Sequence, residues 1–587
     1  MPHYPKSLGR ACAAAIAAAL VSVPACFGQS AEGADSDLIL VNGKIITVDA
    51  RDSIAEAIAI HNGKITAVGG NDEIRKSAAK GARVIDLHGR TATPGLIDTH
   101  CHFGETAALY GVELSKITKI NEAVELVRQK AAARQPGEWI TGSGWDEGKL
   151  SDHRYIYAAD LDRVAPENPV WLMHTTGHYG VANSYALRLA GISRDSKDPP
   201  AGTIDRDTSG SPTGVLKERA MEAVTALIPP FSKEQERNGV LKMMADFNAE
   251  GMTAAKDPGI EPPRWDLYQE ILRDHKSSVR IFALFYGGRT LESARATLAH
   301  LASQPRPPAS LGEGMLLAGG VKLFMDGSGG GRTAWVYDPW YKNRTEPDGT
   351  NTGYPNIEPP VYREMVKLFH ENGIHVSTHA VGDRAIDWVV DTYAELLKEK
   401  PTQGLRHGII HCNIPSDHAI AVMAGLERDY DAGYPETQAP FLWWIGDIYA
   451  ASFGAKRAER LMPYQTYLQK KILWSGGSDY SVTPFPARYG LWASIARQTL
   501  GGLQPFGTAE SVDIHAALKS YTIWAAHQLF LENRIGSLEP GKDADIAVWD
   551  RDMYSVPSSA IKDLHCELTL LRGRIVFRAP QSPISSD

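Results

Sequence analysis

Apolar and polar positions in the centre of the chain follow two alternating patterns. One is a short run of apolar and β-branched residues, and the other is a longer stretch with helical periodicity. In "IDWVVDTYAELLKEK", for example, apolar side chains recur at helical spacing, at Ile386, Val389, Val390, Tyr393 and Leu397. Eight runs are typical of strands, and helical patterns separate them from the second run onward: residues 95–102, 252–257, 280–287, 320–327, 374–381, 408–413, 435–441 and 472–479. This alternation predicts an α/β fold, a (β/α)8 TIM barrel.

The two ends of the chain show a different pattern. Residues 37–93 contain β-branched runs broken by Asn-Gly and Gly-Gly turns, which indicates an antiparallel β module. Residues 536–580 repeat that pattern, so we expect one β-sandwich built from both ends, with the barrel at 94–535 between them. The interval at about 104–250 is too long for one barrel loop, which predicts an inserted subdomain after barrel strand 1, at the mouth of the barrel.

The first residues resemble a targeting segment. Lys6 and Arg10 precede an apolar run too short to span a bilayer with ease, and small polar residues follow. This order predicts a signal peptide at 1–28, and export to the periplasm or the medium without a membrane span after cleavage. Cleavage after Ala25 would leave Cys26 first, so a lipid anchor at Cys26 is the alternative.

Composition narrows the class of protein. The 587 residues are too many for one small core. A net charge of −8 offers no basic patch, which argues against nucleic acid as a partner and leaves a small-molecule substrate. The five cysteines are scattered without a C-x-x-C pair, so neither a disulfide framework nor a zinc ribbon is indicated.

Candidate chemistry begins in "PGLIDTHCHF". His100 and His102 are two residues apart on a predicted strand, so both imidazoles point to the same side, as they would around a metal ion. Cys101 should point away from them. Four further residues stand at the C-terminal ends of barrel strands, where barrel active sites lie: Lys322, His379, His411 and Asp479. Their joint occurrence predicts a metal site.

These motifs carry a family resemblance. "ATPGLIDTHCHF", "TTGHYGVANSYAL", "GVKLFMDGSGGGRTAW", "THAVGDRAIDWVVD", "GIIHCN", "GGSDYSV" and "IGSLEPGKDADIAVWD" resemble the metal-dependent amidohydrolase superfamily, and within it amidohydrolase family 3, which includes N-substituted formamide deformylases. The resemblance covers nearly everything after residue 37. It implies two metal ions per chain, usually zinc, although other divalent metals are open, and at family level a homodimer.

The resemblance also implies a ligand set. His100 and His102 would hold one ion with Asp479, and His379 with His411 would hold the other. Lys322 would bridge both ions as a carbamate, carboxylated by CO₂ on its ε-amine. Lys256, on the second strand, is a competing candidate for that role; the fourth strand and the phrase "VKLFMDG" favour Lys322.

The implied activity is hydrolysis of a non-peptide C–N bond in an amide, an N-acyl or N-formyl amine, or a cyclic amide. A metal-bound hydroxide would attack the carbonyl carbon, and Asp479 would shuttle the proton to the leaving amine. His178 would act on the carbonyl oxygen or hold the substrate, and Trp145, Asp326 and Arg332 would line the pocket. The alternatives are a non-hydrolytic isomerase or decarboxylase on the same barrel, and a non-catalytic secreted binding protein.

Overall fold

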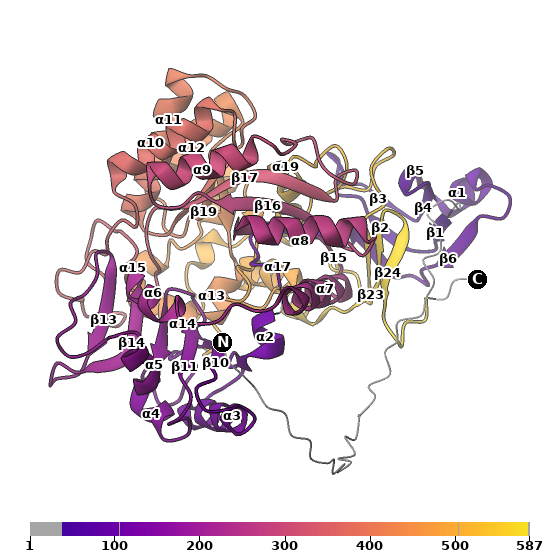
Figure 1. The fold of residues 1–587 in the computed structure, drawn as a ribbon. Helices are drawn as coiled ribbons and strands as arrows, with labels where there is room; N and C mark the ends of the chain where they lie inside the picture. Colours follow the sequence, from indigo (N-terminus) through magenta and orange to yellow (C-terminus); the bar gives the residue numbers. More distant parts are fainter. Residues whose placement is uncertain (1–37, 105, 503, 585–587) are drawn as a thin grey trace, which may run out of the picture. The chain divides into compact units, whose positions relative to one another are not determined.

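The computed structural model describes residues 38–104, 106–502 and 504–584 (Figure 1). The expected signal peptide at 1–28, with its alternative anchor at Cys26, lies outside these residues. Among the helices in the described ranges, none combines the length and the apolar character needed to cross a bilayer.

Eight parallel strands form the central sheet. In sheet order they are β8 (Leu96–Asp98), β15 (Met252–Ile260), β16 (Arg280–Tyr286), β17 (Leu316–Phe324), β18 (Val376–Ala380), β19 (Gly408–His411), β20 (Tyr434–Thr437) and β21 (Ser475–Gly476). The two ends of the sheet meet, because the Thr99 amide donates to the Gly476 carbonyl at 3.1 Å and the Asp479 amide donates to the His100 carbonyl at 2.6 Å. The predicted α/β barrel is confirmed, and each predicted run overlaps an observed strand.

Helices follow the strands and cover the barrel. They are α8 (Pro262–Arg273), α9 (Leu291–Leu301), α10 (Pro359–Glu371), α11 (Asp383–Glu399), α12 (Asp417–Tyr430), α13 (Pro440–Trp444), α14 (Gly446–Phe453), α15 (Ala455–Ala458), α16 (Tyr464–Lys470), α17 (Ala487–Ala496), α18 (Ile514–Ser520) and α19 (Ile523–Gln528). The predicted apolar stripe on α11 is buried at all five positions. The helical periodicity of the sequence therefore indicated correctly which face of α11 packs on the barrel.

Two further sheets share one apolar core. The four-stranded sheet has the order β5-β4-β1-β6 and the six-stranded sheet the order β24-β23-β22-β7-β2-β3, so the second sheet joins strands from both chain ends. Leu40 and Ile58 of the first sheet pack in one cluster with Ile546 and Leu568 of the second. Their strands are β1 (Leu38–Val41), β2 (Lys44–Ile46), β3 (Ile54–Ala55), β4 (Ala57–His61), β5 (Lys64–Gly69), β6 (Arg83–Asp86), β7 (Thr91–Pro94), β22 (Ile546–Trp549), β23 (Cys566–Leu571) and β24 (Arg574–Arg578).

The expectation that this β module is antiparallel throughout was wrong. β1 pairs with β6 in parallel, and β2 pairs with β7 in parallel. The helix α1 (Asn71–Ser77) lies between β5 and β6 and returns the chain for the first of these pairings. A parallel pair needs such a crossover connection, which the Asn-Gly and Gly-Gly turns did not reveal.

The long interval between β8 and β15 contains a sheet of its own, in the order β13-β14-β12-β11-β10-β9. We call this region the insertion. Its strands are β9 (Val112–Glu113), β10 (Ile140–Trp145), β11 (Val170–His174), β12 (Tyr179–Ala182), β13 (Gly202–Arg206) and β14 (Pro212–Glu218). Its helices are α2 (Thr106–Tyr110), α3 (Ile120–Ala132), α4 (Ala158–Asp162), α5 (Ser184–Leu189) and α6 (Glu222–Thr225), and α7 (Lys233–Ala249) leads into β15.

Candidate metal centre

Five barrel strands bring the predicted metal ligands to one end of the barrel. Lys322 lies near the end of β17, His379 lies in β18 and His411 ends β19. His100 and His102 follow β8, and Asp479 follows β21. The C-terminal ends of the strands therefore supply all six side chains, as a barrel active site requires.

The carboxylate of Asp479 connects the two histidines of the first motif. Its Oδ1 atom lies 3.3 Å from Nε2 of His100 and 3.3 Å from Nε2 of His102. Ligating atoms of His100, His411 and Asp479 all lie within 4.8 Å of one another. His411 in turn contacts His379, and the centroids of these two rings are 4.5 Å apart. Four imidazoles and a carboxylate thus form one continuous cluster.

The cluster is buried except on one side. The side chain of His102 is 52% exposed, whereas His100, His379 and His411 are buried. Burial lowers the pKa of His411 to about 3, so its imidazole is neutral at pH 7. Burial opposes ionisation of Asp479, but the imidazoles of His100 and His102 hold the pKa of this carboxyl well below its usual range. Neutral imidazoles and an ionised carboxylate are the forms that bind metal.

The protein orients two of these imidazoles. Nδ1 of His411 lies 2.7 Å from Oε1 of Gln438, whose own amide nitrogen donates to the Glu436 carbonyl at 3.0 Å. The Gln438 oxygen therefore accepts the Nδ1 proton, which leaves the Nε2 lone pair of His411 available. Nε2 of His379 lies 2.9 Å from the carbonyl oxygen of Gly327, which leaves its Nδ1 lone pair available.

The donor set fits a zinc-type metal ion. Nδ1 of His100 is buried without a hydrogen-bond partner. Imidazole nitrogens and carboxylate oxygens are the ligands that zinc takes in catalytic sites. His411 and Asp479 also have backbone φ angles of 71° and 54°, a region that residues other than glycine rarely occupy and that is enriched at functional sites.

Asp98 holds the two ligand-bearing segments together. Its Oδ1 accepts the amide of His100 at 2.9 Å, and its Oδ2 accepts the hydroxyl of Ser478 at 2.6 Å. Burial raises the pKa of Asp98 to about 7, although both donors oppose this shift. Nothing in the sequence singled out Asp98, because a lone carboxylate in an apolar strand has no distinctive spacing.

The two candidate lysines have different surroundings. Lys256 Nζ lies 2.7 Å from Oε1 of Glu436 and 3.0 Å from Oγ of Ser377, so it is part of a buried ion pair. Lys322 is also buried, but no carboxylate lies within ion-pair distance of it in the described chain. Burial lowers the pKa of Lys322 to about 7, against the opposing charges of Asp479 and Glu436. A neutral amine is the form that reacts with CO₂, so this geometry favours Lys322.

His178 reaches the cluster from the insertion. Its ring centroid lies 5.2 Å from that of His379, and its Nδ1 lies 3.0 Å from Oε1 of Glu218. Burial opposes protonation of His178, but the Glu218 carboxylate raises its pKa above the usual value. Glu218 lies in the stretch "VLKERA", and nothing in the sequence linked it to a histidine 40 residues away.

Three predicted pocket residues have other contacts. Trp145 is fully buried in the core of the insertion, where its Nε1 donates to the Leu172 carbonyl at 2.9 Å, so it does not line a pocket. Asp326 is also fully buried and accepts three backbone amides, those of Trp335, Val381 and Gly382, at 2.9–3.0 Å. It supports the segment that follows β18, the strand of His379. Arg332 pairs with Asp348 at 3.5 Å within the β17–α10 connection.

A second group of metal-ligating side chains lies in the insertion, at Asp146, Glu147 and His174. The backbone amide of Thr176 donates to Nδ1 of His174 at 3.1 Å, which puts the proton of the neutral ring on Nε2. Nε2 then faces Glu147 at 3.1 Å and the Tyr179 hydroxyl at 2.8 Å. His174 is therefore a hydrogen-bond donor here, and this group is a structural network beside the His178 loop.

The closed barrel and the histidine–carboxylate cluster define a metal-dependent hydrolase. Residues 83–577 match the sequence model of the amidohydrolase family, and the chain belongs to this family. This membership supports a hydrolase that acts on carbon–nitrogen bonds.

Individual relatives match over nearly their whole length. The chain is 27% identical to an N-substituted formamide deformylase of Arthrobacter pascens, over 92% of this chain and 97% of that protein. It is 28% identical to the protein LONG AFTER FAR-RED 3 of Arabidopsis thaliana, over 90% of each. A solved metal-dependent hydrolase of Pyrococcus horikoshii has the same fold, with a TM-score of 0.68 at 23% identity over 89% of this chain and 99% of that one.

Proposed function

We propose that this chain hydrolyses an amide, an N-acyl or N-formyl amine, or a cyclic amide, with Asp479 as the proton shuttle. The observation that carries the proposal is the position of Asp479 Oδ1, 3.3 Å from both His100 and His102. A carboxylate kept ionised in a buried site can accept a proton from water and return it to a leaving group. The similarity to a formamide deformylase supports the substrate class.

We propose that this site binds two divalent metal ions, with zinc as the first candidate. His100, His102 and Asp479 would hold one, His379 and His411 the other, and a carboxylated Lys322 would join both. Such ions, when bound, lower the pKa of water from 15.7 to about 7 and polarise a carbonyl oxygen. Lys322 is buried and has no ion-pair partner among the described residues, whereas Lys256 pairs with Glu436. This difference supports Lys322 as the bridging residue.

The chain's own groups then divide the remaining tasks. Asp479 accepts the proton released by water and delivers it to the departing nitrogen, which needs protonation to leave. His178, held by Glu218, donates a hydrogen bond to the substrate carbonyl oxygen from the insertion side. Thr175, three residues earlier, donates to the Val482 carbonyl at 2.7 Å and thereby ties the His178 loop to the segment that carries Asp479.

Metal content and turnover of one protein preparation test this proposal. Plasma mass spectrometry should find two equivalents of metal in the wild type and one or none in Lys322→Ala. A panel of N-formyl and N-acyl amines in H₂¹⁸O should give the carboxylate product with one ¹⁸O atom. Metal-free, folded wild type would contradict the mechanism, and turnover without ¹⁸O uptake would favour an isomerase or decarboxylase.

We also propose export of the mature chain, on the charge and hydropathy order of residues 1–28. N-terminal sequencing of protein from a periplasmic or secreted fraction should begin near Cys26. An intact residue 1 in that fraction would contradict cleavage, and a lipid-modified Cys26 would identify the anchored form.

A further inference from the structure

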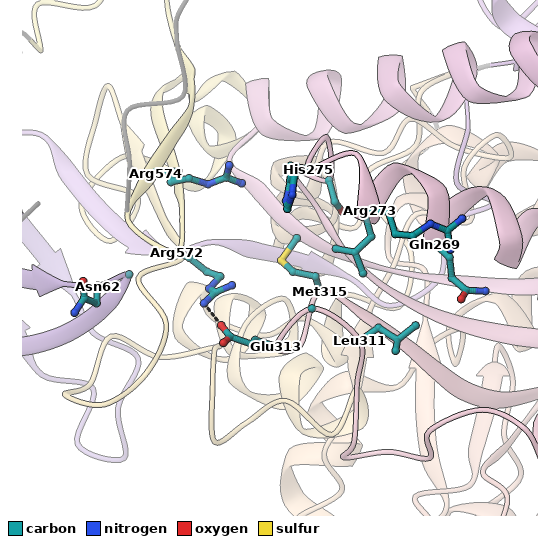
Figure 2. Close-up of a pocket in the computed structure, with 13 residues that line it drawn as sticks. Asn62, Gln269, Arg273, His275, Leu311, Glu313, Met315, Arg572 and Arg574 are labelled. Carbon is teal, nitrogen blue, oxygen red and sulfur yellow. Dashed lines mark hydrogen bonds and ion pairs between the residues drawn. The ribbon is translucent and has the colours of Figure 1, made fainter. Parts of the chain in front are cut away.

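A cavity of about 790 Å³ lies far from the candidate metal centre (Figure 2). Met315, in its wall, directly precedes β17, whereas Lys322 lies near the other end of the same strand. The cavity therefore opens at the N-terminal end of the barrel strands, where it is bounded by the β-sandwich. No residue of the candidate metal centre lines it.

Arginines dominate the polar part of this wall. Arg273 ends α8 and His275 follows it. Arg572 lies in the turn between β23 and β24, and Arg574 begins β24. In Figure 2, Arg574 extends from the β24 side towards His275. The turn is anchored, because the amide of Arg572 donates to Oδ1 of Asp545 at 2.9 Å. The sandwich thus presents two guanidinium groups, two residues apart, on a fixed support.

Only part of this positive charge is neutralised. Glu313 is the one carboxylate in the wall, and it pairs with Arg572. Within the described residues, Arg273 and Arg574 make no side-chain hydrogen bond or ion pair. The carboxylates nearest in sequence are engaged elsewhere: Asp274 with Arg237 at 2.6 Å, Glu270 with Lys233 at 2.5 Å and Asp545 with Arg280 at 2.6 Å.

The remainder of the wall is apolar. Leu272, Leu311 and Met315 form it, and Met315 is buried. Cavities of this size hold small molecules, and an apolar lining with a few convergent polar groups is their usual composition. A ligand that satisfies both parts of this wall needs a negative head and an apolar body.

We propose that this cavity binds a small organic oxyanion with an apolar body, held by Arg574, which extends towards His275 across the cavity (Figure 2). The guanidinium fork matches the paired oxygens of a carboxylate or a phosphate, and both anions share that chemistry. The ligand would contact the barrel and the sandwich at once. This site is independent of the proposed hydrolysis, so either proposal can fail alone.

Calorimetric titration of the full, metal-loaded protein tests the site. The probes are octanoate and octyl phosphate, with 1-octanol as the uncharged counterpart. We expect at least one anion to bind, and octanol to bind at least tenfold more weakly. The variant Arg574→Gln should lose at least about tenfold in anion affinity, since a hydrogen bond to a charged group is worth that much or more.

Arg295→Gln is the matched control, because Arg295 is exposed on α9 and outside the cavity. It should bind the anions like the wild type. Because both anions also bind zinc, the loss has to occur in Arg574→Gln at unchanged metal content. Equal binding of octanol, an equal loss in Arg295→Gln, or no anion binding at millimolar concentration would each overturn the proposal. Binding of one anion alone would identify the head group.

Discussion

Oε1 of Glu218 lies 3.0 Å from Nδ1 of His178 and accepts the hydroxyl of Thr333 at 2.5 Å. The first contact lies within the insertion, and the second reaches the connection that follows β17. One carboxylate therefore orients a histidine against the candidate metal centre and fixes the insertion to the barrel. Its two roles can be separated by substitution.

Glu218→Gln should lower kcat/KM by roughly 10–100-fold, the usual effect of removing a group that orients a functional histidine. Metal content should stay unchanged, because Glu218 contacts none of the proposed ligands. His178→Ala should have a similar effect, and the double variant should be no worse than the more affected single one. Glu222→Gln, on the exposed neighbouring helix, serves as control. Loss of metal in Glu218→Gln would contradict this assignment.

Gln438→Leu should weaken metal binding about 10–100-fold, because the Nδ1 proton of His411 loses its acceptor. Competition with a chelator, followed by metal analysis, measures the change. The control variant Gln129→Leu, on the exposed face of α3, should leave the metal affinity unchanged. An unchanged affinity in Gln438→Leu would show that the imidazole needs no such support.

Lys256→Met should destabilise the fold by about 3–5 kcal/mol, because it leaves the Glu436 carboxylate buried without its cation. The double variant Lys256→Met/Glu436→Gln should recover part of that loss. Both should retain two metal ions if Lys322 is the bridging residue. The readouts are thermal unfolding and metal content, and loss of metal with full stability would instead make Lys256 the bridge.

Acid should weaken one ion pair at the opposite end of the barrel. Arg406 binds Glu532 through two hydrogen bonds, at 2.7 and 3.0 Å. Burial opposes ionisation of Glu532, but His527 and Arg406 lower its pKa to about 2. Since this pKa lies below the value of 4.5 in the unfolded chain, the pair's contribution is complete above pH 4.5 and disappears as the pH falls towards 2.

Glu532→Gln should therefore unfold at a lower temperature than the wild type at pH 7, by an amount that reflects roughly 1–3 kcal/mol. The difference should shrink at pH 3.5. Glu364→Gln, which removes an exposed partner of Arg363, should change the unfolding temperature little at either pH. A difference between Glu532→Gln and the wild type that does not depend on pH would rule out this linkage.

Local patterns in the sequence were sufficient for the barrel. Most barrel strands appear as apolar runs and α11 appears as a stripe, because burial against one core imposes its period on neighbouring residues. His100 and His102 were placed on one side for the same reason. The parallel pairings of the sandwich were missed, since turn residues describe where a chain reverses and not which strand it returns to.

The supporting residues of the candidate site were missed for a different reason. Gln438 is 27 residues from His411, and Glu218 is 40 residues from His178. A single contact between side chains that are distant along the chain leaves no periodic pattern in the sequence. Trp145 and Asp326 were assigned to the pocket because they lie in motif stretches, but packing decides whether such a side chain faces a cavity or the core. Both are fully buried.

The sequence by itself determined the order of the eight strands and the chemistry at their ends. It left two lysines as candidates for one role, because both stand on barrel strands. Only the tertiary structure distinguished them. It brings Glu436, 180 residues from Lys256, to within 2.7 Å of that amine and leaves Lys322 without a carboxylate partner in the described chain. A buried charge needs a partner, and which residue supplies it depends on the closure of the barrel.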